Sequence, residues 1–275
     1  MQIDVVTIFP EMFPGVLGAS MIKRAQERGV LKIKVRDLRK HTHDRRRTVD
    51  DRPYGGGPGM VMKPEPIFEA VQAIRRRCRH ARRRGSSCRT LLLSPQGERL
   101  SSSLAQRLAK AEHLILVCGH YEGVDERVKL SLVDQAVSIG DYVLTGGELP
   151  AMVLIDCLAR FIPGVIGHDQ AMAEESFADG WLEYPQYTRP PVFRKMTVPN
   201  VLLSGNHERI ARWRKLQSVA RTLASRPDLV KTRSSQPNRP ACPVCRLGDR
   251  TGRRARHGPL RERGAGREDH SNGVA

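Results

Sequence analysis

The chain has 275 residues, of which 39% are apolar and 28% are charged, values typical of a globular protein of one large or two modest domains. Six cysteines are too few for a small disulfide-stabilised extracellular protein. Apolar runs such as residues 91–93 and 114–118 have the length of strands, whereas a transmembrane helix needs roughly 20 residues. The first residues show neither the basic segment nor the small-residue cleavage site of a signal peptide. We therefore expect a cytoplasmic protein with reduced thiols and no membrane segment.

The net charge of +18 is unevenly distributed along the chain. Residues 75–89 contain eight arginines and no acidic residue, and residues 231–275 contain 11 basic and four acidic side chains. These two segments carry 15 of the 18 net charges, so the rest of the chain is nearly neutral. Such clusters suit a polyanionic partner such as nucleic acid. An exposed helix end and a loose tail rich in arginine would have the same composition, so charge alone leaves both interpretations open.

Strand and helix signals alternate along the first 165 residues. Pro64 stands where a helix would begin, and apolar residues at helical spacing follow it towards the arginine cluster. Residues 148–162 are apolar nearly all round, which predicts a buried helix. Strands are expected at residues 2–9, 31–36, 90–93, 113–118 and 135–139, and a serine-capped helix at 101–111. This alternation predicts an α/β domain with a mainly parallel sheet over residues 1–162.

The pattern changes after Pro163, where glycine, proline and acidic residues become frequent. From Pro163 to about Pro199 this composition indicates a linker or an ordered surface loop. We divide the chain into a linker at residues 163–180 and a small helical domain at residues 181–230. An amphipathic helix is predicted over residues 206–225. Its apolar face consists of Ile210, Trp213, Leu216, Ala220 and Leu223. Residues 231–275 contain hardly an aliphatic side chain, which predicts a disordered basic tail.

Three glycine-rich segments, at residues 94–97, 118–123 and 139–148, directly follow strand signals. In open α/β sheets, the loops at the carboxyl ends of parallel strands hold the ligand. Glycine lets the backbone approach such a ligand closely. Each segment alone would be an ordinary strand–helix turn, but three so close in sequence favour a nucleotide-like ligand. None has the G-x-G-x-x-G spacing of a dinucleotide site.

A polar loop lies before these segments. Residues 43–54 carry side chains of both charges and end in an aromatic residue, and residues 55–59 form the sequence Gly-Gly-Gly-Pro-Gly. The glycines resemble a phosphate-binding loop, but Met60 and Met62 stand where an ATPase needs Lys followed by Ser or Thr. The loop is either solvated surface or a segment that grips a substrate.

Cys242 and Cys245 have the C-x-x-C spacing of zinc or redox sites. A structural zinc site needs four ligands, and His257 and His270 are the only imidazoles nearby, so zinc is not favoured. Motifs of the common hydrolases, G-x-S-x-G and H-E-x-x-H, are absent. No ligand spacing connects the remaining cysteines, Cys78, Cys88, Cys118 and Cys157. We therefore assign no metal-binding residue.

Glu174 and Glu175 precede Ser176, and Arg160 stands near the end of the predicted buried helix before them. A carboxylate and a guanidinium around one pocket can divide the work of accepting a proton and stabilising the developing negative charge. By spacing alone, however, a pair of glutamates is usually solvated surface.

Longer stretches of the sequence are more specific than any of these patterns. They are residues 42–60, 92–97, 118–127, 138–155, 160–164, 184–190 and 202–207. In these stretches the chain resembles the bacterial tRNA (guanine-N(1)-)-methyltransferase family. The likeness covers about residues 1–230, in the same order and with little gapping.

The resemblance implies an α/β domain of the SPOUT methyltransferase class, with a mainly parallel sheet and a deep trefoil knot, one of the rare true knots. A small helical, tRNA-binding C-terminal domain would follow, truncated because residues beyond about 230 do not match the family. The family is an obligate homodimer with its active sites at the subunit interface. It transfers a methyl group from S-adenosylmethionine to ring nitrogen 1 of the guanosine 3′ to the tRNA anticodon (position 37). A requirement for Mg²⁺ is left open.

The resemblance also assigns residues. Glu175 matches the general base, for which the family has Asp, and Arg160 matches the arginine that holds the guanine O6. His120 stands where many members carry Arg. The expected cofactor-binding residues are Leu93, Ser94, Pro95, Gly97, Gly119, Tyr121, Glu122, Gly123, Ile139, Gly140, Asp141, Tyr142, Val143, Leu144, Gly146 and Gly147. The expected substrate-binding residues are Asp50, Arg52, Tyr54 and Gly59.

Two other hypotheses stay open. The first is a noncatalytic RNA-binding relative, which only the replacement of Asp by Glu175 favours. The second is a zinc-linked regulatory protein that acts through the C-x-x-C segment.

Overall fold

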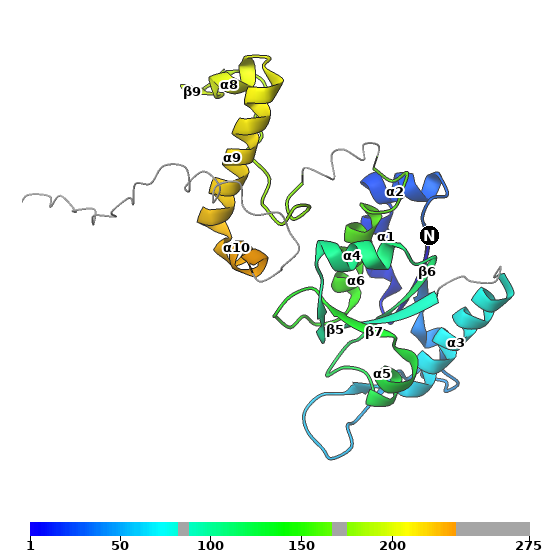
Figure 1. The fold of residues 1–275 in the computed structure, drawn as a ribbon. Helices are drawn as coiled ribbons and strands as arrows, with labels where there is room; N and C mark the ends of the chain where they lie inside the picture. The colour runs from blue at the N-terminus through cyan, green and yellow to red at the C-terminus, as the bar shows by residue number, and fades with distance from the viewer. Residues whose placement is uncertain (82–87, 167–174, 235–275) are drawn as a thin grey trace, which may run out of the picture.

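The computed structural model describes residues 1–81, 88–166 and 175–234. A five-stranded sheet with the strand order β2-β1-β6-β5-β7 forms the centre of the protein (Figure 1). All four strand pairs are parallel. The strands are β1 (Gln2–Thr7), β2 (Lys32–Asp37), β5 (Cys88–Arg99), β6 (His113–Cys118) and β7 (Gln135–Ser138). The predicted α/β domain with a mainly parallel sheet is therefore confirmed.

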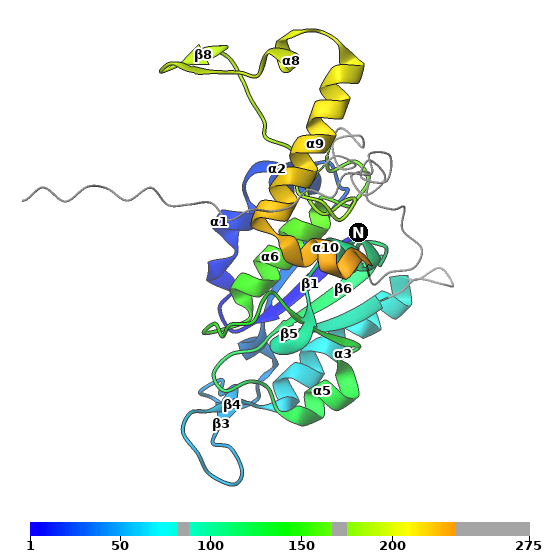
Figure 2. The ribbon, with the colours of Figure 1, turned by 60° about the vertical axis from the view of Figure 1, so that its left-hand side comes forward.

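Helices cover both faces of this sheet (Figure 2). One face packs against α3 (Pro64–Ala81) and α5 (Glu126–Leu132). The other packs against α1 (Pro14–Leu17), α2 (Ser20–Glu27), α4 (Ser102–Ala109) and α6 (Glu148–Ala159). Alternate residues of β6 enter the two cores: Leu114 and Leu116 face α4 and α6, and Ile115 and Val117 face α3. Every residue of β6 is buried, which explains its continuous apolar sequence.

The smaller elements connect or follow this domain. They are the 3₁₀ helices η1 (Pro10–Met12) and η2 (Leu38–His41), the antiparallel pairs β3 (Asp50–Asp51) with β4 (Val61–Met62) and β8 (Val192–Phe193) with β9 (Met196–Thr197), and the helices α8 (Asn200–Leu203), α9 (His207–Ser225) and α10 (Pro227–Ser234). Figure 1 shows α8, α9 and α10 outside the sheet domain. None of the helices in the described ranges has the length and apolar character needed to cross a membrane.

The helices α4 and α9 begin at the residues predicted from the sequence, and each start is capped by a polar side chain. The Ser101 hydroxyl accepts a hydrogen bond of 3.2 Å from the Leu104 backbone N–H at the start of α4, and Asn206 accepts one of 3.0 Å from Arg209 at the start of α9. Helix α5 was not predicted, although Asp125 caps it through the Arg127 N–H at 2.9 Å. The predicted tail begins too early, because α10 continues to Ser234. The rest of that tail, with its C-x-x-C segment, lies outside the described residues.

Strand β5 is longer than the predicted strand at residues 90–93. It continues through residues 94–97, which we expected to form a loop. Its pairing with β7 shifts register between Leu93 and Glu98, so this segment bulges within the strand. A Cβ atom on Gly97 would lie 2.6 Å from the Val137 carbonyl carbon, so only glycine allows the two strands to meet here.

The predicted apolar face of α9 is wrong in part. Leu216 and Leu223 are 48% and 52% exposed, whereas Ser218 and Thr222 are buried. The reason is that the backbone of Leu182 crosses this helix: its N–H donates to the Thr222 hydroxyl at 2.9 Å, and its carbonyl accepts from the Ser218 hydroxyl at 2.6 Å. The hydroxyl groups of Ser218 and Thr222, together with the buried Val219, therefore determine which face is covered.

A buried polar cluster lies at the amino-terminal ends of β1 and β6. The carboxylate of Asp4, which is completely buried, accepts hydrogen bonds from Arg36 Nε at 2.7 Å and Gln2 Nε2 at 2.7 Å and faces His113 Nε2 at 2.9 Å. Burial alone would raise the pKa of Asp4, but the hydrogen bonds from His113, Gln2 and Arg36 outweigh it and lower the pKa to about 2. Asp4 is therefore a buried, hydrogen-bonded anion.

Candidate functional site

A pocket of about 250 Å³ lies at the carboxyl ends of β6 and β7, beside the bulge in β5. Four segments line it, residues 92–96, 119–124, 137–140 and 142–147. The three glycine-rich segments of the sequence therefore meet at one site. Two of them follow the ends of the parallel strands β6 and β7, which lie at the same edge of the sheet, and the first forms the bulge of β5 beside them.

Most of the expected cofactor-binding residues line this pocket. They are Leu93, Ser94, Pro95, Gly119, Tyr121, Glu122, Gly123, Ile139, Gly140, Tyr142, Val143, Leu144, Gly146 and Gly147. Gly97 and Asp141 do not: Gly97 lies between β5 and β7, and the exposed Asp141 faces Arg99 at 3.6 Å. Sequence reasoning missed Lys129 and Pro150, which also line the pocket. Lys129 was missed together with α5, for which the capping residue Asp125 was the available signal.

The backbone of two segments meets directly at Gly119 and Gly147. The Gly147 N–H donates to the Gly119 carbonyl at 2.7 Å, and Gly146 pairs with His120 in an isolated antiparallel bridge. A Cβ atom on Gly147 would lie 2.8 Å from the Cys118 Cα and 2.9 Å from the Gly119 nitrogen. Both neighbours are backbone atoms, which have little freedom to move away, so this side of the pocket requires glycine.

The polar loop at residues 43–59 reaches the pocket at its last residue. Hydrogen bonds between backbone groups tie β4 to the loop after β6: Glu122 donates to Met60 at 3.0 Å, and Met62 donates to Gly123 at 2.9 Å. Gly59 has a φ of +81° and lies against the side chain of Glu122. Tyr121, with a φ of 58°, is one of the few non-glycine residues in the left-handed region.

The other expected substrate-binding residues lie farther along this loop. Asp50 pairs with Met62 in the two-stranded ladder of β3 and β4. Arg52 and Tyr54 are exposed, and neither lines the pocket. Of the four expected substrate-binding residues, Gly59 is thus the one that lies beside a residue of the pocket, Glu122.

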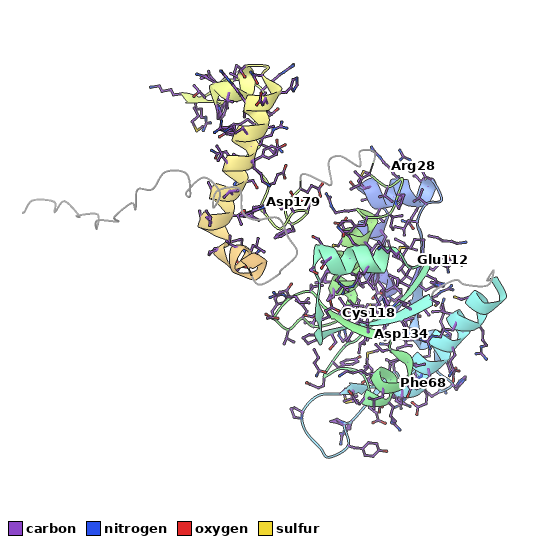
Figure 3. All side chains as sticks on the ribbon, viewed as in Figure 1. Arg28, Phe68, Glu112, Cys118, Asp134 and Asp179 are labelled. Carbon is purple, nitrogen blue, oxygen red and sulfur yellow. The ribbon has the colours of Figure 1, made fainter. Side chains whose placement is uncertain are left out.

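A buried carboxylate supports the floor of the site. Glu148, in the first turn of α6, accepts a hydrogen bond of 2.7 Å from the Thr7 hydroxyl, and its other oxygen lies 3.6 Å from His120 Nδ1. The positive end of the α6 dipole favours this negative charge. Burial, together with the charge of Glu148, raises the pKa of the Cys118 thiol. Cys118 lies at the end of β6, within the sheet domain (Figure 3), and is buried. Because its pKa is raised, this thiol is neutral.

Arg160 and Glu175 form an ion pair. Arg160 is the residue that ends α6, and Glu175 follows in the next described segment. Neither side chain lines the pocket at the sheet edge. Glu175 instead lines a second cavity of about 200 Å³ with Trp181, Tyr184 and residues of α9. The expected catalytic pair is therefore together, but apart from the pocket at the sheet edge. Glu174 lies outside the described residues.

The sheet and its pocket define the class of this protein: an open α/β protein with a small-ligand site at the carboxyl edge of the sheet. The family model described as tRNA (Guanine-1)-methyltransferase TrmD matches residues 1–232. A tRNA (guanine-N(1)-)-methyltransferase of Moorella thermoacetica is 56% identical over 230 residues, which cover 84% of this chain and 90% of the relative. One of Dictyoglomus turgidum is 53% identical over 234 residues, with 85% and 91% covered. The chain belongs to the tRNA (guanine-1)-methyltransferase family, so the resemblance seen in the sequence is confirmed.

Proposed function

We propose that the protein transfers a methyl group from S-adenosylmethionine to ring nitrogen 1 of guanine in tRNA, at the guanosine 3′ to the anticodon. The observation that carries this proposal is the pocket formed by all three glycine-rich segments, in a chain that the family model matches over residues 1–232. The relatives carry the same activity in their names. A tRNA substrate places the reaction in the cytoplasm.

The residues of the pocket fit S-adenosylmethionine. Leu93, Pro95 and Leu144 offer apolar surface for an adenine ring, and the peptide groups of the glycine-rich segments offer hydrogen-bond partners. Glu122, Glu126 and Lys129 add charges of both signs, as a ligand with an amino-acid end requires. When bound, this cofactor supplies an electrophilic methyl group on a positively charged sulfur.

Glu175 is the proposed general base, and Arg160 its electrostatic partner. Guanine N1 carries a proton and is a poor nucleophile until that proton leaves. A carboxylate can accept the proton, and the negative charge then spreads onto O6, where a guanidinium stabilises the transition state more than the ground state. The ion pair between Arg160 and Glu175 supports these roles, because it holds both groups at one position.

We further propose a homodimer in which the Arg160–Glu175 pair of one chain serves the pocket of the other. Two observations support it. The pair lies outside the pocket of its own chain. In addition, α6 is apolar nearly all round, yet Leu149 and Val153 are 49% and 46% exposed. Exposed apolar residues on one helix are typical of an interface between subunits.

A trefoil knot is part of the same proposal. Strand β5 lies between β6 and β7, so the chain crosses the sheet between consecutive strands. The segment after β7 then returns to the loop after β6, where Gly147 hydrogen-bonds Gly119, before α6 begins at Glu148. This return of a later segment behind an earlier loop supports a knotted path.

The proposed tRNA-binding domain is residues 181–230, after a linker at 163–180. It presents cations beside aromatic rings: the Arg214 guanidinium lies 4.7 Å from the Tyr184 ring, and Lys215 lies 5.9 Å from Trp181. A cavity of about 560 Å³ between residues 184–191 and helices α8 and α9 has Arg189 and Arg214 in its wall. Cationic and aromatic groups together suit an RNA ligand.

The test measures transfer of a tritiated methyl group from S-adenosylmethionine to unmodified tRNA transcripts. The matched control is a transcript with A in place of the G 3′ to the anticodon. We expect label in the first transcript, recovered as N1-methylguanine, and none in the second. Binding of tRNA without labelling would favour the noncatalytic relative. Chelating and restoring Mg²⁺ in the same assay decides whether that ion takes part.

A further inference from the structure

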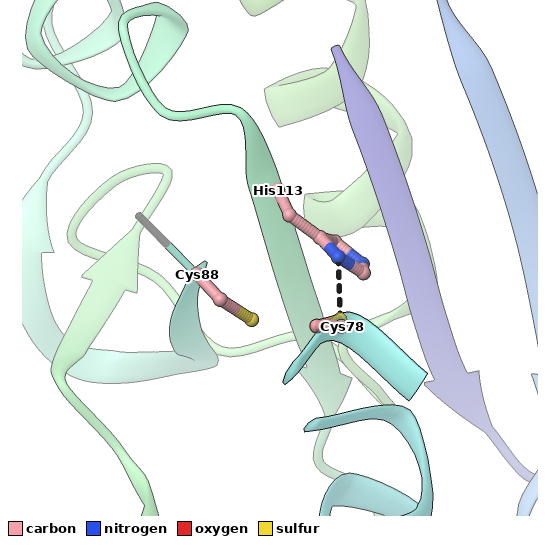
Figure 4. Close-up of side chains that lie close together, drawn as sticks. All are labelled: Cys78, Cys88 and His113. Atoms are coloured by element: carbon pink, nitrogen blue, oxygen red, sulfur yellow. Dashed lines mark hydrogen bonds between the residues drawn. The ribbon is translucent and has the colours of Figure 1, made fainter. Parts of the chain in front are cut away.

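Two thiols and an imidazole converge at the edge of the sheet opposite to the pocket (Figure 4). Cys88 and His113 are the first residues of β5 and β6, and they are register partners in the parallel ladder. Cys78 lies near the end of α3, the helix that covers this face of the sheet. One ligand atom of each residue lies within 4.8 Å of the other two, and Cys78 Sγ is 2.8 Å from His113 Nδ1. The proposed methyl transfer uses none of them.

We propose that Cys78, Cys88 and His113 bind a zinc ion. Thiolate and imidazole are the ligands that Zn²⁺ prefers, and a tetrahedral ion keeps Zn–S distances of about 2.3 Å and Zn–N distances of about 2.0 Å. These distances separate the ligand atoms by roughly 3.5 Å, so side-chain rotations are enough to admit the ion. Cys88 is half-buried, which leaves a side of the cluster open to a water molecule as the fourth ligand.

Asp4 orients the imidazole of this cluster. Its buried carboxylate lies 2.9 Å from His113 Nε2, on the far side of the ring from Cys78. Arg36 Nε, at 2.7 Å, holds the carboxylate in place. A carboxylate that accepts the second ring N–H of a ligand histidine fixes its tautomer and makes it a better metal ligand. Asp4 is therefore a positioning residue, and the cluster has both a ligand set and its support.

The charges of the ligands themselves suit a divalent cation, although the segment that carries both cysteines, residues 75–89, also contains eight arginines. Two thiolates neutralise the ion, and Asp4 already pairs with Arg36. The ion would join the end of α3 to the starts of β5 and β6, which lie far from the carboxyl edge of the sheet. Its expected role is thus to stabilise the fold rather than to take part in methyl transfer.

The experiment uses the full chain with Cys242→Ser and Cys245→Ser, because the C-x-x-C segment is a second source of thiol ligands. Co²⁺ is the optical probe, and Zn²⁺ is measured by elemental analysis. We expect one ion per chain and intense thiolate-to-cobalt absorption. Adding Cys88→Ser should abolish stoichiometric binding, and adding Asp4→Asn should weaken zinc affinity about 10–100-fold while the absorption pattern stays. Adding Cys157→Ser, which removes a half-buried thiol on α6, should change neither value.

Two results would overturn the proposal. One is an unchanged cobalt spectrum after Cys88→Ser, and the other is the loss of all metal with Cys242→Ser and Cys245→Ser alone. A disulfide between Cys78 and Cys88 in freshly purified protein, seen as a mass lower by two hydrogens, would also contradict it. Thermal unfolding adds a separate readout. Zn²⁺ should raise the melting temperature of the chain with Cys242→Ser and Cys245→Ser, but not that of the same chain with Cys88→Ser added. If Cys78→Ser does not fold, Cys88→Ser still carries the test, because this side chain is half-buried.

Discussion

Glu175 differs from the aspartate expected of the family by one methylene group, and Arg160 is its ion-pair partner. A longer side chain carries the same acceptor-only carboxylate to a slightly different position. Proton transfer to it therefore needs the guanine to compete with the guanidinium for the carboxylate. In the proposed mechanism, the guanidinium turns from the carboxylate to O6 as negative charge develops there. The carboxylate is then free to accept the proton.

Replacing Glu175 by Gln should lower the single-turnover rate of methyl transfer by roughly 10²–10⁴-fold, since the amide cannot accept the proton. Glu175→Asp should remain active. Calorimetry should show nearly unchanged affinity for S-adenosylmethionine in both variants, because the proposed role of the carboxylate is to act on the guanine and not on the cofactor. Glu27→Gln, on the exposed face of α2, is the matched control and should keep the normal rate. A normal rate in Glu175→Gln would move the base elsewhere.

Gly147→Ala should distort the backbone that lines the pocket. The added Cβ would lie 2.8 Å from the Cys118 Cα, and relieving such an overlap typically costs about 1–3 kcal/mol. We expect a lower free energy of unfolding in urea and a loss of S-adenosylmethionine binding. Gly15→Ala is the control, because nothing lies within 4 Å of its Cβ position. Equal stability and cofactor affinity in the two variants would contradict the role given to Gly147.

Among the elements, α6 takes part in the pocket, in the ion pair and in the exposed apolar surface. Its first turn carries Glu148 beneath the pocket, its end carries Arg160, and its buried side packs against α4 and the sheet. Its remaining side exposes Leu149 and Val153. A helix that is apolar all round is buried on all sides when it is stable. The exposed side is therefore the place where a second chain is expected.

Leu149→Glu combined with Val153→Glu should separate the proposed dimer. Sedimentation should show monomers, and methyl transfer should be lost because each pocket would lack the pair from the other chain. Thermal unfolding followed by far-UV circular dichroism should still be cooperative, since both side chains are half-exposed in the single chain. Leu130→Glu places one such charge on the exposed side of α5 and should leave the dimer intact. Full activity in a monomeric double variant would refute the shared site.

At the scale of the whole molecule, the net positive charge is concentrated in two segments, residues 75–89 of the sheet domain and the residues that follow α10. Residues 235–275 contain nine basic and four acidic side chains. Contacts between cations and RNA phosphates release counterions, so they make binding depend on salt. Deleting residues 235–275 should therefore weaken tRNA binding most at low salt and reduce the slope of log affinity against log salt. Each lost phosphate contact should remove about 0.7–0.9 from that slope. An unchanged slope would show that this segment does not touch the tRNA.

Local signals in the sequence were enough to predict the parallel α/β domain. Caps and periodicity act over three or four residues, which is why Ser101 marked the start of α4 and apolar spacing predicted the helix α9. The family motifs also pointed to the three glycine-rich segments. Their meeting at one pocket followed from a general rule, because parallel strands end at the same edge of a sheet.

Contacts between residues far apart in sequence decided the rest. The bulge in β5 depends on Gly97 meeting Val137, and the covered face of α9 depends on the backbone of Leu182. Cys78 and His113 are 35 residues apart and share no motif, yet helix α3 lies over the sheet so that their side chains touch. Composition, caps and family were thus readable from the sequence by itself. Which side chains face one another was decided only by the tertiary structure, because burial and hydrogen bonding depend on segments that the chain brings together on folding.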